Sequence, residues 1–445
     1  MATKAALLAQ RARRVFPGNK WTRAPLSEAW LLDDPQGRFP TFLTSGSGCR
    51  VTDVDGRTFI DYHCAFGANV LGYNDERVEA AAAMAAKHTG GQLLSGPTSY
   101  SVELAERLIA LRPGSTWAMF AKNGSDVTTM ARVAARAATG GRYVLREASA
   151  LGARAYHGAA PQWLHGKPGV TDGESAALEL TFLYNDLESV EEAVAHAAAD
   201  GGVAAIFVGG CSYPYSAPTV EPTPAFIRGL RAIADRAGAL LVLDEIRTAF
   251  RVGRGVAPGS WVEAGGGGGS GGATWAPDLH CICKAVANGH PIAALVGNDA
   301  ARDGAGAMMS TGTYWLGAPS MAAALATLDA LEAEGSAAMA SMQARGTRLA
   351  RGLEARARAH GVPALVSGPP AMPFLTFEGE APHARPLGER WCAEMAARGV
   401  WLHPHHNWYL CASHTDDDVD ATLVAAEGAF DALAAGGVGG APGAR

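Results

Sequence analysis

Hydrophobic and polar positions along the middle of the chain follow two repeats, which predict alternating helices and strands. Short apolar runs such as 203–208 (VAAIFV) and 239–243 (ALLVL) predict buried strands. The segments 186–199 and 224–237, which each precede one of these runs, carry the spacing of amphipathic helices. Because buried strands that alternate with helices build a sheet covered on both faces, the pattern predicts an α/β fold with a mostly parallel central sheet.

The same patterns predict elements on both sides of this region. Residues 50–62 alternate around Asp55-Gly56, which predicts a β-hairpin with an Asp-Gly turn. Residues 1–16 lack the unbroken apolar core of a signal peptide and predict an amphipathic helix. Further helices are expected at 75–88, 100–111, 123–139, 320–334, 336–360 and from about 417 to 434. Further strands are expected at 117–120, 279–283, 292–297, 372–377, 400–403 and 408–412.

Composition narrows the class of protein. The chain has 445 residues, which suggests two lobes when a domain holds roughly 150 residues. Its 48% hydrophobic and 18% charged residues are typical of a folded globular protein. A net charge of −6 without a basic stripe disfavours nucleic-acid binding. No run of about 18 apolar residues occurs, so we expect no membrane span. Seven cysteines without a Cys-x-x-Cys pair favour a reducing, cytoplasmic setting.

Three features in the α/β region can carry chemistry, and the first is Asn123-Gly124-Ser125-Asp126. It lies between a predicted strand and a predicted helix. Gly124 allows a ligand to approach the backbone, and the helix start offers free N–H groups and a positive dipole end, which together suit a phosphate. Ser125 adds a hydroxyl donor. The alternative is an ordinary helix N-cap, for which these residue types are preferred.

The second feature is Asp244, which directly follows the buried run 239–243. A buried carboxylate is costly unless it is paired, and a protonated pyridine nitrogen is a suitable partner. Helix capping or a salt bridge in the next loop is the alternative. A metal carboxylate of the Walker type is disfavoured, because no Gly-x-x-x-x-Gly-Lys-Ser/Thr sequence occurs.

The third feature is Lys284, which ends the apolar run 279–283 shortly before the next predicted strand. Such a lysine is poorly placed for solvent, and burial lowers a lysine pKa, which suits a Schiff-base nucleophile. A surface lysine that reaches past the apolar strand into water is the alternative.

Taken together and in this order, the three features resemble the class III aminotransferases of fold type I, most closely the branch of glutamate-1-semialdehyde aminomutase. The resemblance runs from about Arg14 to Leu433. Pro277-Asp278-Leu279 followed by Lys284 has the spacing of the family's lysine motif, and Gly124-Ser125-Asp126 is similar to its phosphate cup.

Other motifs support the same resemblance. The octapeptide 244–251 (DEIRTAFR) is similar to the family's Asp-Glu-Val-x-Thr-Gly-Phe-Arg, with Ala249 where the family has glycine. Tyr156-His157-Gly158 is similar to its Tyr-His-Gly, whose aromatic ring stacks on the cofactor. Gly312-Thr313 resembles the Gly-Thr whose threonine reaches the phosphate of the partner subunit. The segment 413–418 (SHTDDD) is similar to the family's Ala-His-Thr-Asp-Glu-Asp.

The resemblance implies pyridoxal 5′-phosphate (PLP) as the cofactor, held by Lys284 as a Schiff base. In the family the aspartate at position 244 binds the pyridine nitrogen, and the apolar residue at 246, here Ile246, packs under the ring. The resemblance also implies a homodimer with shared active sites, and a large PLP-binding domain at 76–320. A smaller α+β domain would then combine the N-terminal segment 1–75 with the C-terminal segment 321–445.

Departures from the family pattern affect the substrate side. The usual Glu-Pro after the strand at 203–208 is replaced by Val208-Gly209-Gly210-Cys211, the run 146–154 is longer than usual, and 265–272 is a glycine-rich insertion. The lost Glu-Pro and residues 284–290 (KAVANGH) resemble aminotransferases that act on amino sugars in aminoglycoside antibiotic biosynthesis.

Some further residues bear on the substrate or on a metal. Arg23 resembles the arginine that grips a substrate carboxylate in the aminomutase branch, with an ordinary surface arginine as the alternative. His403, His405 and His406 are expected to form a pocket wall near Trp408 rather than a metal site. The cysteines 281 and 283 alternate with Ile282 on a strand and are expected in the core.

The sequence therefore predicts a PLP-dependent aminotransferase that acts between a small-molecule amino donor and a ketone or aldehyde acceptor, without a metal. Two alternatives stay open. The first is an aminomutase or epimerase on the same cofactor site, and the second is a nucleotide-binding α/β protein with no covalent cofactor.

Overall fold

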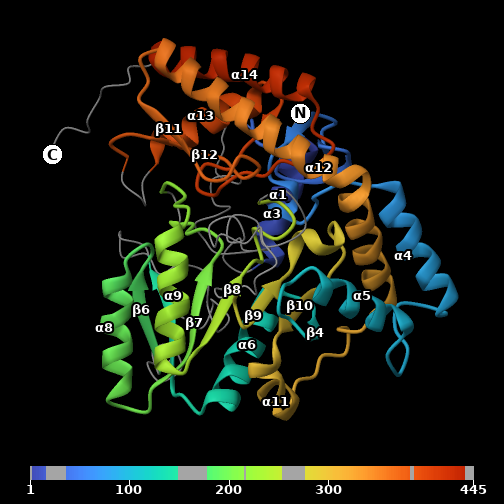
Figure 1. The fold of residues 1–445 in the computed structure, drawn as a ribbon. Coiled ribbons are helices and arrows are strands. Elements are labelled where there is room, and N and C mark those ends of the chain that lie inside the picture. Colours follow the sequence, from blue (N-terminus) through green and yellow to red (C-terminus); the bar gives the residue numbers. More distant parts are fainter. Residues whose placement is uncertain are drawn as a thin grey trace.

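A computed structural model describes residues 3–16, 37–148, 178–214, 217–252, 276–380 and 385–435 of the protein. A seven-stranded sheet forms the centre of the lower part in Figure 1, in the order β4-β10-β9-β8-β7-β5-β6. Its strands are β4 (Trp117–Ala121), β5 (Tyr143–Ala148), β6 (Glu179–Leu183), β7 (Val203–Gly209), β8 (Leu240–Asp244), β9 (Leu279–Ile282) and β10 (Ala293–Gly297).

Helices cover both faces of this sheet, as the sequence predicts. They are α6 (Gly124–Thr139) and α11 (Asp299–Ala307) on one face, and α8 (Leu187–Ala198) and α9 (Pro224–Ala237) on the other. Phe207 and Val242 pack toward α6, whereas their neighbours Ile206 and Leu241 pack toward α8 and α9. Because side chains of a strand alternate between faces, both faces must be apolar, and this confirms the predicted α/β architecture.

One strand runs against the others. β10 pairs antiparallel with both β4 and β9, whereas all other neighbours in this sheet are parallel. Only a short link, which contains the 3₁₀ turn η3 (Lys284–Ala287), joins β9 to β10. Parallel neighbours need a crossover of about a dozen or more residues, so this link can only reverse the chain. The sheet is therefore mostly, but not wholly, parallel.

A second sheet brings the two ends of the chain together, in the order β1-β2-β3-β13. β2 and β3 form the predicted hairpin, whose turn has Gly56 at φ +87°. β13 lies parallel to β3, although more than 300 residues of chain separate them. The elements here and in the adjoining upper part of Figure 1 are β1 (Leu43–Ser47), β2 (Arg50–Asp53), β3 (Thr58–Asp61), β11 (Ala364–Ser367), β12 (Phe374–Phe377), β13 (Val400–Trp401), α13 (Pro386–Ala397) and α14 (Asp416–Ala435).

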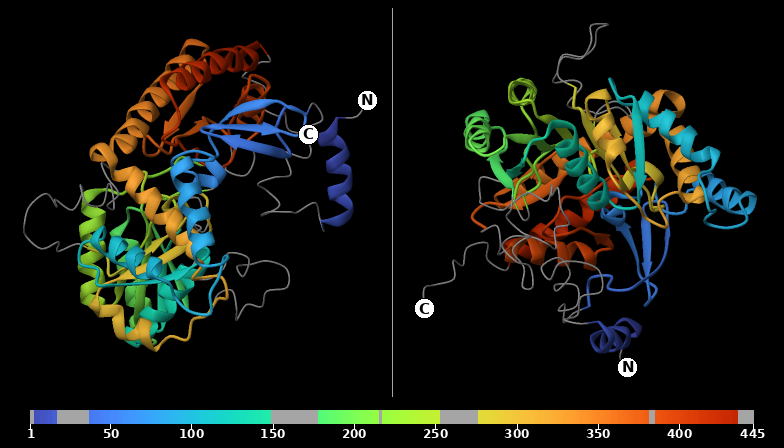
Figure 2. Two further views of the ribbon diagram at one scale, coloured as in Figure 1. Left: turned by 90° about the vertical axis from the view of Figure 1, so that its right-hand side faces the viewer. Right: turned by 90° about the horizontal axis from the view of Figure 1, so that it is seen from below.

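Long helices link the upper and lower parts. The remaining elements are α1 (Lys4–Val15), α3 (Cys64–Gly67), α4 (Glu76–His88), α5 (Ser99–Ala110) and α12 (Ala318–Ala359). α12 packs against α4 and α5 and also against α14, while α1 stands apart from the main body (Figure 2). α12 is broken at 333–336, where Glu334, Gly335 and Ser336 have positive φ angles, and this agrees with the two helices predicted at 320–334 and 336–360.

One predicted strand is wrong. Residues 408–412 are extended, but their N–H groups bond in turn to Pro373, Tyr62, Ala371 and Val70, which belong to different neighbours. The segment therefore lies between residues 371–373 and residues 62–70, and it pairs as a strand with neither. Trp408, Tyr409, Leu410 and Cys411 are all at most 1% exposed, so the apolar run reports burial here rather than a sheet.

Several elements are not predicted from the sequence at all, namely β1, β5, β6, β11, α11 and α13. Alanine and glycine make up six of the nine residues of α11, so no large apolar side chain marks its buried face. Among the helices of the described ranges, none reaches the length and hydropathy that a bilayer crossing requires.

Candidate active site

The three chemical features predicted from the sequence meet at one edge of the large sheet. Gly124 opens α6 after β4, Asp244 ends β8, and Lys284 follows β9, and these three strands run in the same direction. The thiol of Cys283 lies among them. Burial raises the pKa of Cys283, the N–H groups of Lys284 and Gly124 lower it, and the charge of Asp244 raises it. The edge therefore combines an amine, a carboxylate and a helix N-terminus.

The amine of Lys284 is held in place inside the protein. Its Nζ donates to the carbonyl oxygen of Phe66 at 2.8 Å, and the residue is half-buried. Lys284 has φ +52°, and its partner lies in α3, where Cys64, Ala65 and Phe66 have φ angles of 44°, 51° and 57°. Left-handed conformations are costly for residues with side chains and cluster at functional sites. The position of Lys284 contradicts the alternative of a lysine extended into solvent.

Asp244 and Glu245 are consecutive carboxylates with different surroundings. Asp244 is 6% exposed, and its Oδ1 accepts the N–H of Ile246 at 2.9 Å. It pairs in the sheet with Gly209 on one side and Cys281 on the other, so it lies in the middle of the edge.

Glu245 belongs to a buried charge cluster behind this edge. Its Oε2 accepts Arg112 Nε at 3.0 Å and His280 Nδ1 at 2.8 Å, and all three side chains are at most 3% exposed. Burial alone would raise the pKa of Glu245, but the charge of Arg112 and the hydrogen bond from His280 hold it below its ordinary value. Glu245 is thus an ionised structural partner.

Replacing Glu245 with leucine is expected to lower the free energy of unfolding by about 3–5 kcal/mol, because it removes one charge of a buried pair and leaves Arg112 in the interior. Glu245→Gln keeps an oxygen for Arg112 and should lose less. Urea unfolding measures both, with the exposed Glu192→Gln on α8 as the control. A leucine variant as stable as the control would show that this cluster does not stabilise the fold.

The start of α6 works both as a cap and as an open helix end. The carboxylate of Asp126 accepts the N–H groups of Lys122 and Asn123 at 3.3 and 2.9 Å. Asp126 therefore caps the helix, as the alternative interpretation expects. Its hydrogen bonds use N–H groups of residues before Gly124 and do not involve those of Gly124 or the exposed Ser125. A Cβ at position 124 would lie 2.6 Å from Ile246 Cδ1, so the absence of a side chain lets Ile246 pack against the helix start. Cap and anion site can therefore share this terminus.

A pocket lies beside this edge. Its lining residues come from the loop after β7, the segment after β8, β12 and the segment after β13: Tyr213, Pro214, Thr219, Arg247, Phe374, His405, His406 and Asn407. The segment that follows the altered residues 208–211 thus meets the expected histidine wall in one cavity. The expected pocket wall is correct for His405 and His406.

Trp408 lies beside that wall, as expected, because its ring contacts Phe374 of the pocket lining, but its side chain belongs to the core. It is 1% exposed, its Nε1 donates to the carbonyl oxygen of His403 at 2.9 Å, and its ring stacks on Trp391 with centroids 5.9 Å apart. Of the expected variable run 146–154, the described part belongs to β5. There Arg146 is buried against Glu179 at 3.0 Å, so it supports the sheet.

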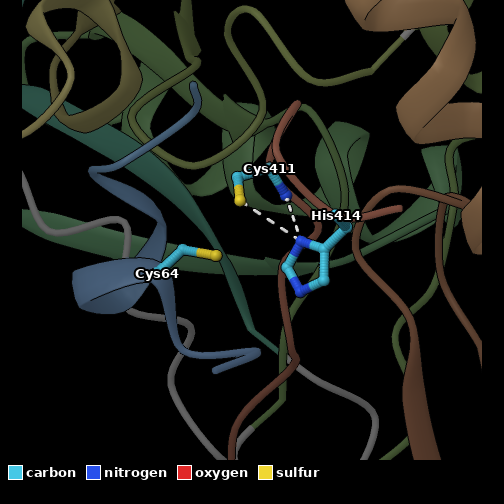
Figure 3. Close-up of side chains that lie close together, drawn as sticks. All are labelled: Cys64, Cys411 and His414. Atoms are coloured by element: carbon cyan, nitrogen blue, oxygen red, sulfur yellow. Dashed lines mark hydrogen bonds between the residues drawn. The ribbon is translucent and has the colours of Figure 1, made fainter. Parts of the chain in front are cut away.

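Cys64 of α3 lies close to Cys411 and His414 (Figure 3). Their ligand atoms lie within 4.8 Å of one another, and all three are buried. His414 Nδ1 already accepts the N–H of Cys411 at 3.0 Å, and Cys64 Sγ donates to the carbonyl oxygen of Tyr409 at 3.4 Å. Structural zinc sites use four ligands, and the contacts here fasten residues 409–414 to α3. We therefore assign the cluster to packing of the C-terminal segment.

The structure does not place four of the predicted site residues at this edge. Arg23, Tyr156 and His157 lie outside the described residues. Thr313 lies in an exposed turn ahead of α12, beside the exposed Tyr314 and Leu316. Cys281 is in the core as expected, whereas Cys283 is half-buried at the site itself.

Sequence reasoning missed Phe66, Tyr213 and Arg247. Phe66 contributes a backbone carbonyl, which no side-chain pattern can indicate. Arg247 occupies the variable position of the motif 244–251, and a charge in that position next to Ile246 was the available signal.

Comparisons with known proteins agree with this geometry. The sequence profile of the family described as "Aminotransferase class-III" matches residues 32–415. An aminopentol aminotransferase from Sphingopyxis macrogoltabida is 38% identical over 427 residues, which is 96% of this chain and 93% of that protein. A glutamate-1-semialdehyde 2,1-aminomutase from Chloroflexus aurantiacus is 32% identical over 423 residues, which covers 89% of this chain and 91% of that protein.

Solved structures show the same similarity. The PLP internal aldimine form of the FumI protein from Sphingopyxis sp. MTA144 superposes with a TM-score of 0.84 at 36% identity, over 96% of this chain and 95% of that one. An omega-transaminase from Sphaerobacter thermophilus has a TM-score of 0.79 at 22% identity, over 97% and 98% of the two chains, and at this identity it supports the fold alone.

Proposed function

The chain belongs to the class III aminotransferases and uses pyridoxal phosphate, and we propose that Lys284 and Asp244 carry its amino-transfer reaction. Family membership removes the alternative of a nucleotide-binding protein without a covalent cofactor. The comparisons also favour an aminotransferase over an aminomutase. The observation that carries the site assignment is the meeting of an amine, a buried carboxylate and a helix N-terminus at one sheet edge.

The residues present at this edge fit the cofactor. Asp244 is a buried anion suited to a ring cation, and the start of α6, with Gly124 and Ser125, suits a phosphate. Ile246, packed on Gly124, offers an apolar surface for a flat ring. When bound, PLP supplies an aldehyde that takes up amines and a ring that withdraws electrons. Tyr156, His157 and the partner's Thr313 complete the set that we propose for stacking and phosphate binding.

The chain's own groups then have separate tasks. Lys284 is the nucleophile that holds the cofactor and, once released by an incoming amine, the base that moves a proton at the substrate carbon. The Phe66 carbonyl fixes where Nζ lies, which limits the positions from which it can take the proton. Asp244, in the middle of the edge, is the carboxylate that would pair with the ring nitrogen of the cofactor.

The absorbance of the purified protein tests this proposal. We expect an absorbance band near about 410–420 nm that bleaches when an amino donor is added and returns with a carbonyl acceptor. A panel of L-glutamate, L-alanine, aliphatic amines and amino sugars identifies the donor class. A protein without this band after incubation with PLP would contradict the proposal.

The substrate part of the proposal is an amine or carbonyl compound that carries hydroxyl groups. The most similar relative described above is named for an aminopentol, which is a hydroxylated amine. An amino sugar of an aminoglycoside antibiotic pathway, indicated by residues 208–211 and 284–290, belongs to the same chemical class.

We also propose a homodimer, a cytoplasmic setting and the division into 1–75, 76–320 and 321–445. The dimer is supported by apolar side chains that flank Thr313: Met309, Tyr314 and Leu316 are 95%, 65% and 40% exposed. The cytoplasmic setting is supported by seven free cysteines, six of them buried. The sheet shared by β1–β3 and β13 supports a small domain built from both ends of the chain.

A further inference from the structure

The pocket beside the sheet edge carries a positive charge at a defined place. Of its eight described lining residues, Arg247 is the permanent cation and none is acidic. The aromatic and imidazole rings of Tyr213, Phe374 and His406 form most of the remaining wall. A lining whose permanent charge is positive favours an anionic group.

Arg247 is oriented by groups that are themselves fixed. Its guanidinium lies 4.8 Å from the ring centroid of Tyr213, and its Nη1 donates to Asn407 Oδ1 at 3.3 Å. Tyr213 is 6% exposed, and its hydroxyl lies 3.8 Å from Met372 Sδ. Asn407 is 5% exposed and donates to the carbonyl oxygen of Trp408 at 3.0 Å. A planar guanidinium stacked on a ring presents its donor edge in one plane, as two-point carboxylate binding requires.

His406 connects this arginine with the amine of Lys284. Its ring lies 5.7 Å from that of Phe66, whose carbonyl oxygen holds Lys284 Nζ. Burial lowers the pKa of His406 well below its ordinary value, and the charges of Arg247, His403 and Lys284 lower it further. His406 Nδ1 lies 2.7 Å from the carbonyl oxygen of Asn407, so it must be the donor, and Nε2 is the acceptor nitrogen of a neutral ring. The guanidinium and the amine thus both lie close enough to this uncharged imidazole to lower its pKa.

We propose that Arg247 binds the carboxylate of the amino donor and of the oxo acid it becomes, so that the donor is an amino acid and not a simple amine. This inference rests on the proposed function, because it places the donor's amino group at Lys284. The neutral His406 adds no charge that competes with Arg247 for the carboxylate. Tyr213 and Asn407 are positioning residues that act through the guanidinium.

The test compares two kinds of donor in the same holoenzyme. Bleaching of the cofactor band in single-turnover mixing gives kcat/KM for L-alanine or L-glutamate and for a primary amine without a carboxylate. Arg247→Met should lower kcat/KM for the amino acids by about 10–150-fold, as expected for hydrogen bonds to a charged group, and change that for the amine by less than about threefold. Arg247→Lys, which keeps the charge but loses the planar fork, should lie in between.

The controls separate this inference from the proposed function. Arg228→Met, on the exposed face of α9, should behave as the wild type toward both donors. Loss of the cofactor band in the wild type would contradict the proposed function itself. With the band intact, the assignment of Arg247 is overturned by equal losses for both donors, by no loss for either, or by a wild type that accepts only amines without a carboxylate.

Discussion

Replacing Lys284 with alanine is expected to lower turnover by about 10⁴-fold or more, because it removes both the nucleophile and the proton carrier. The absorbance band near about 410–420 nm should disappear, since no side chain remains to link the cofactor covalently. The fold should survive, because Lys284 is half-buried and not part of the core. Alanine loses the hydrogen bond to Phe66, but it is no more strained at φ +52° than lysine.

Two further variants make this prediction specific. Lys284→Arg keeps a positive charge that can still reach the Phe66 carbonyl, but a guanidinium does not lose its proton, so this variant should also be inactive. Lys87→Ala, on the exposed side of α4, should retain both activity and band. Turnover in Lys284→Ala above about 1% of the wild type, together with the band, would remove Lys284 from its proposed role.

The position of Lys284 was predictable because the chemistry depends on local order in the sequence. A strand, a short interval and a lysine can be read directly from residues 277–284. A strand that ends in Asp244 can be read in the same way from residues 239–244. The partner of Lys284 was not predictable in the same way. Phe66 lies 218 residues earlier and contributes only a backbone carbonyl in a left-handed turn. No pattern of side chains reports such a contact.

The same distinction explains the errors in the fold. The hairpin at 50–62 and the strands β7 and β8 follow from local periodicity, which survives in the structure. The path of 408–412 depends on which distant segments lie alongside. A buried apolar run looks the same in both situations, so the sequence alone cannot separate a strand from a buried segment that pairs with no strand.

Consecutive carboxylates at 244 and 245 show what the structure adds within a motif. The sequence presents two similar acids, and either can end a buried strand. In the structure Glu245 is matched by Arg112 and His280 behind the sheet, whereas Asp244 lies in the middle of the edge with Lys284 and the start of α6. Glu245 is therefore expected to matter for stability, and Asp244 for catalysis.

Asp244→Asn therefore tests catalysis while it keeps the contact with Ile246. Asparagine keeps an oxygen that can accept the N–H of Ile246, so the end of β8 should stay intact and the melting temperature should change little. Turnover is expected to fall by about 10²–10³-fold, the usual effect of losing one preorganised electrostatic partner of a reacting group. Steady-state kcat and the strength of cofactor binding measure the effect, with Asp303→Asn on the exposed side of α11 as the matched control.

The two acids also predict opposite signatures, which makes the assignment falsifiable as a pair. Glu245→Gln should lower the free energy of unfolding and leave kcat nearly unchanged, because the partners of Glu245 are Arg112 and His280 and not the reacting groups. Asp244→Asn should lower kcat more than stability. If Asp244→Asn unfolds the protein while its remaining folded fraction keeps full turnover, Asp244 is a structural residue, and the charge that serves the cofactor must come from elsewhere on this edge.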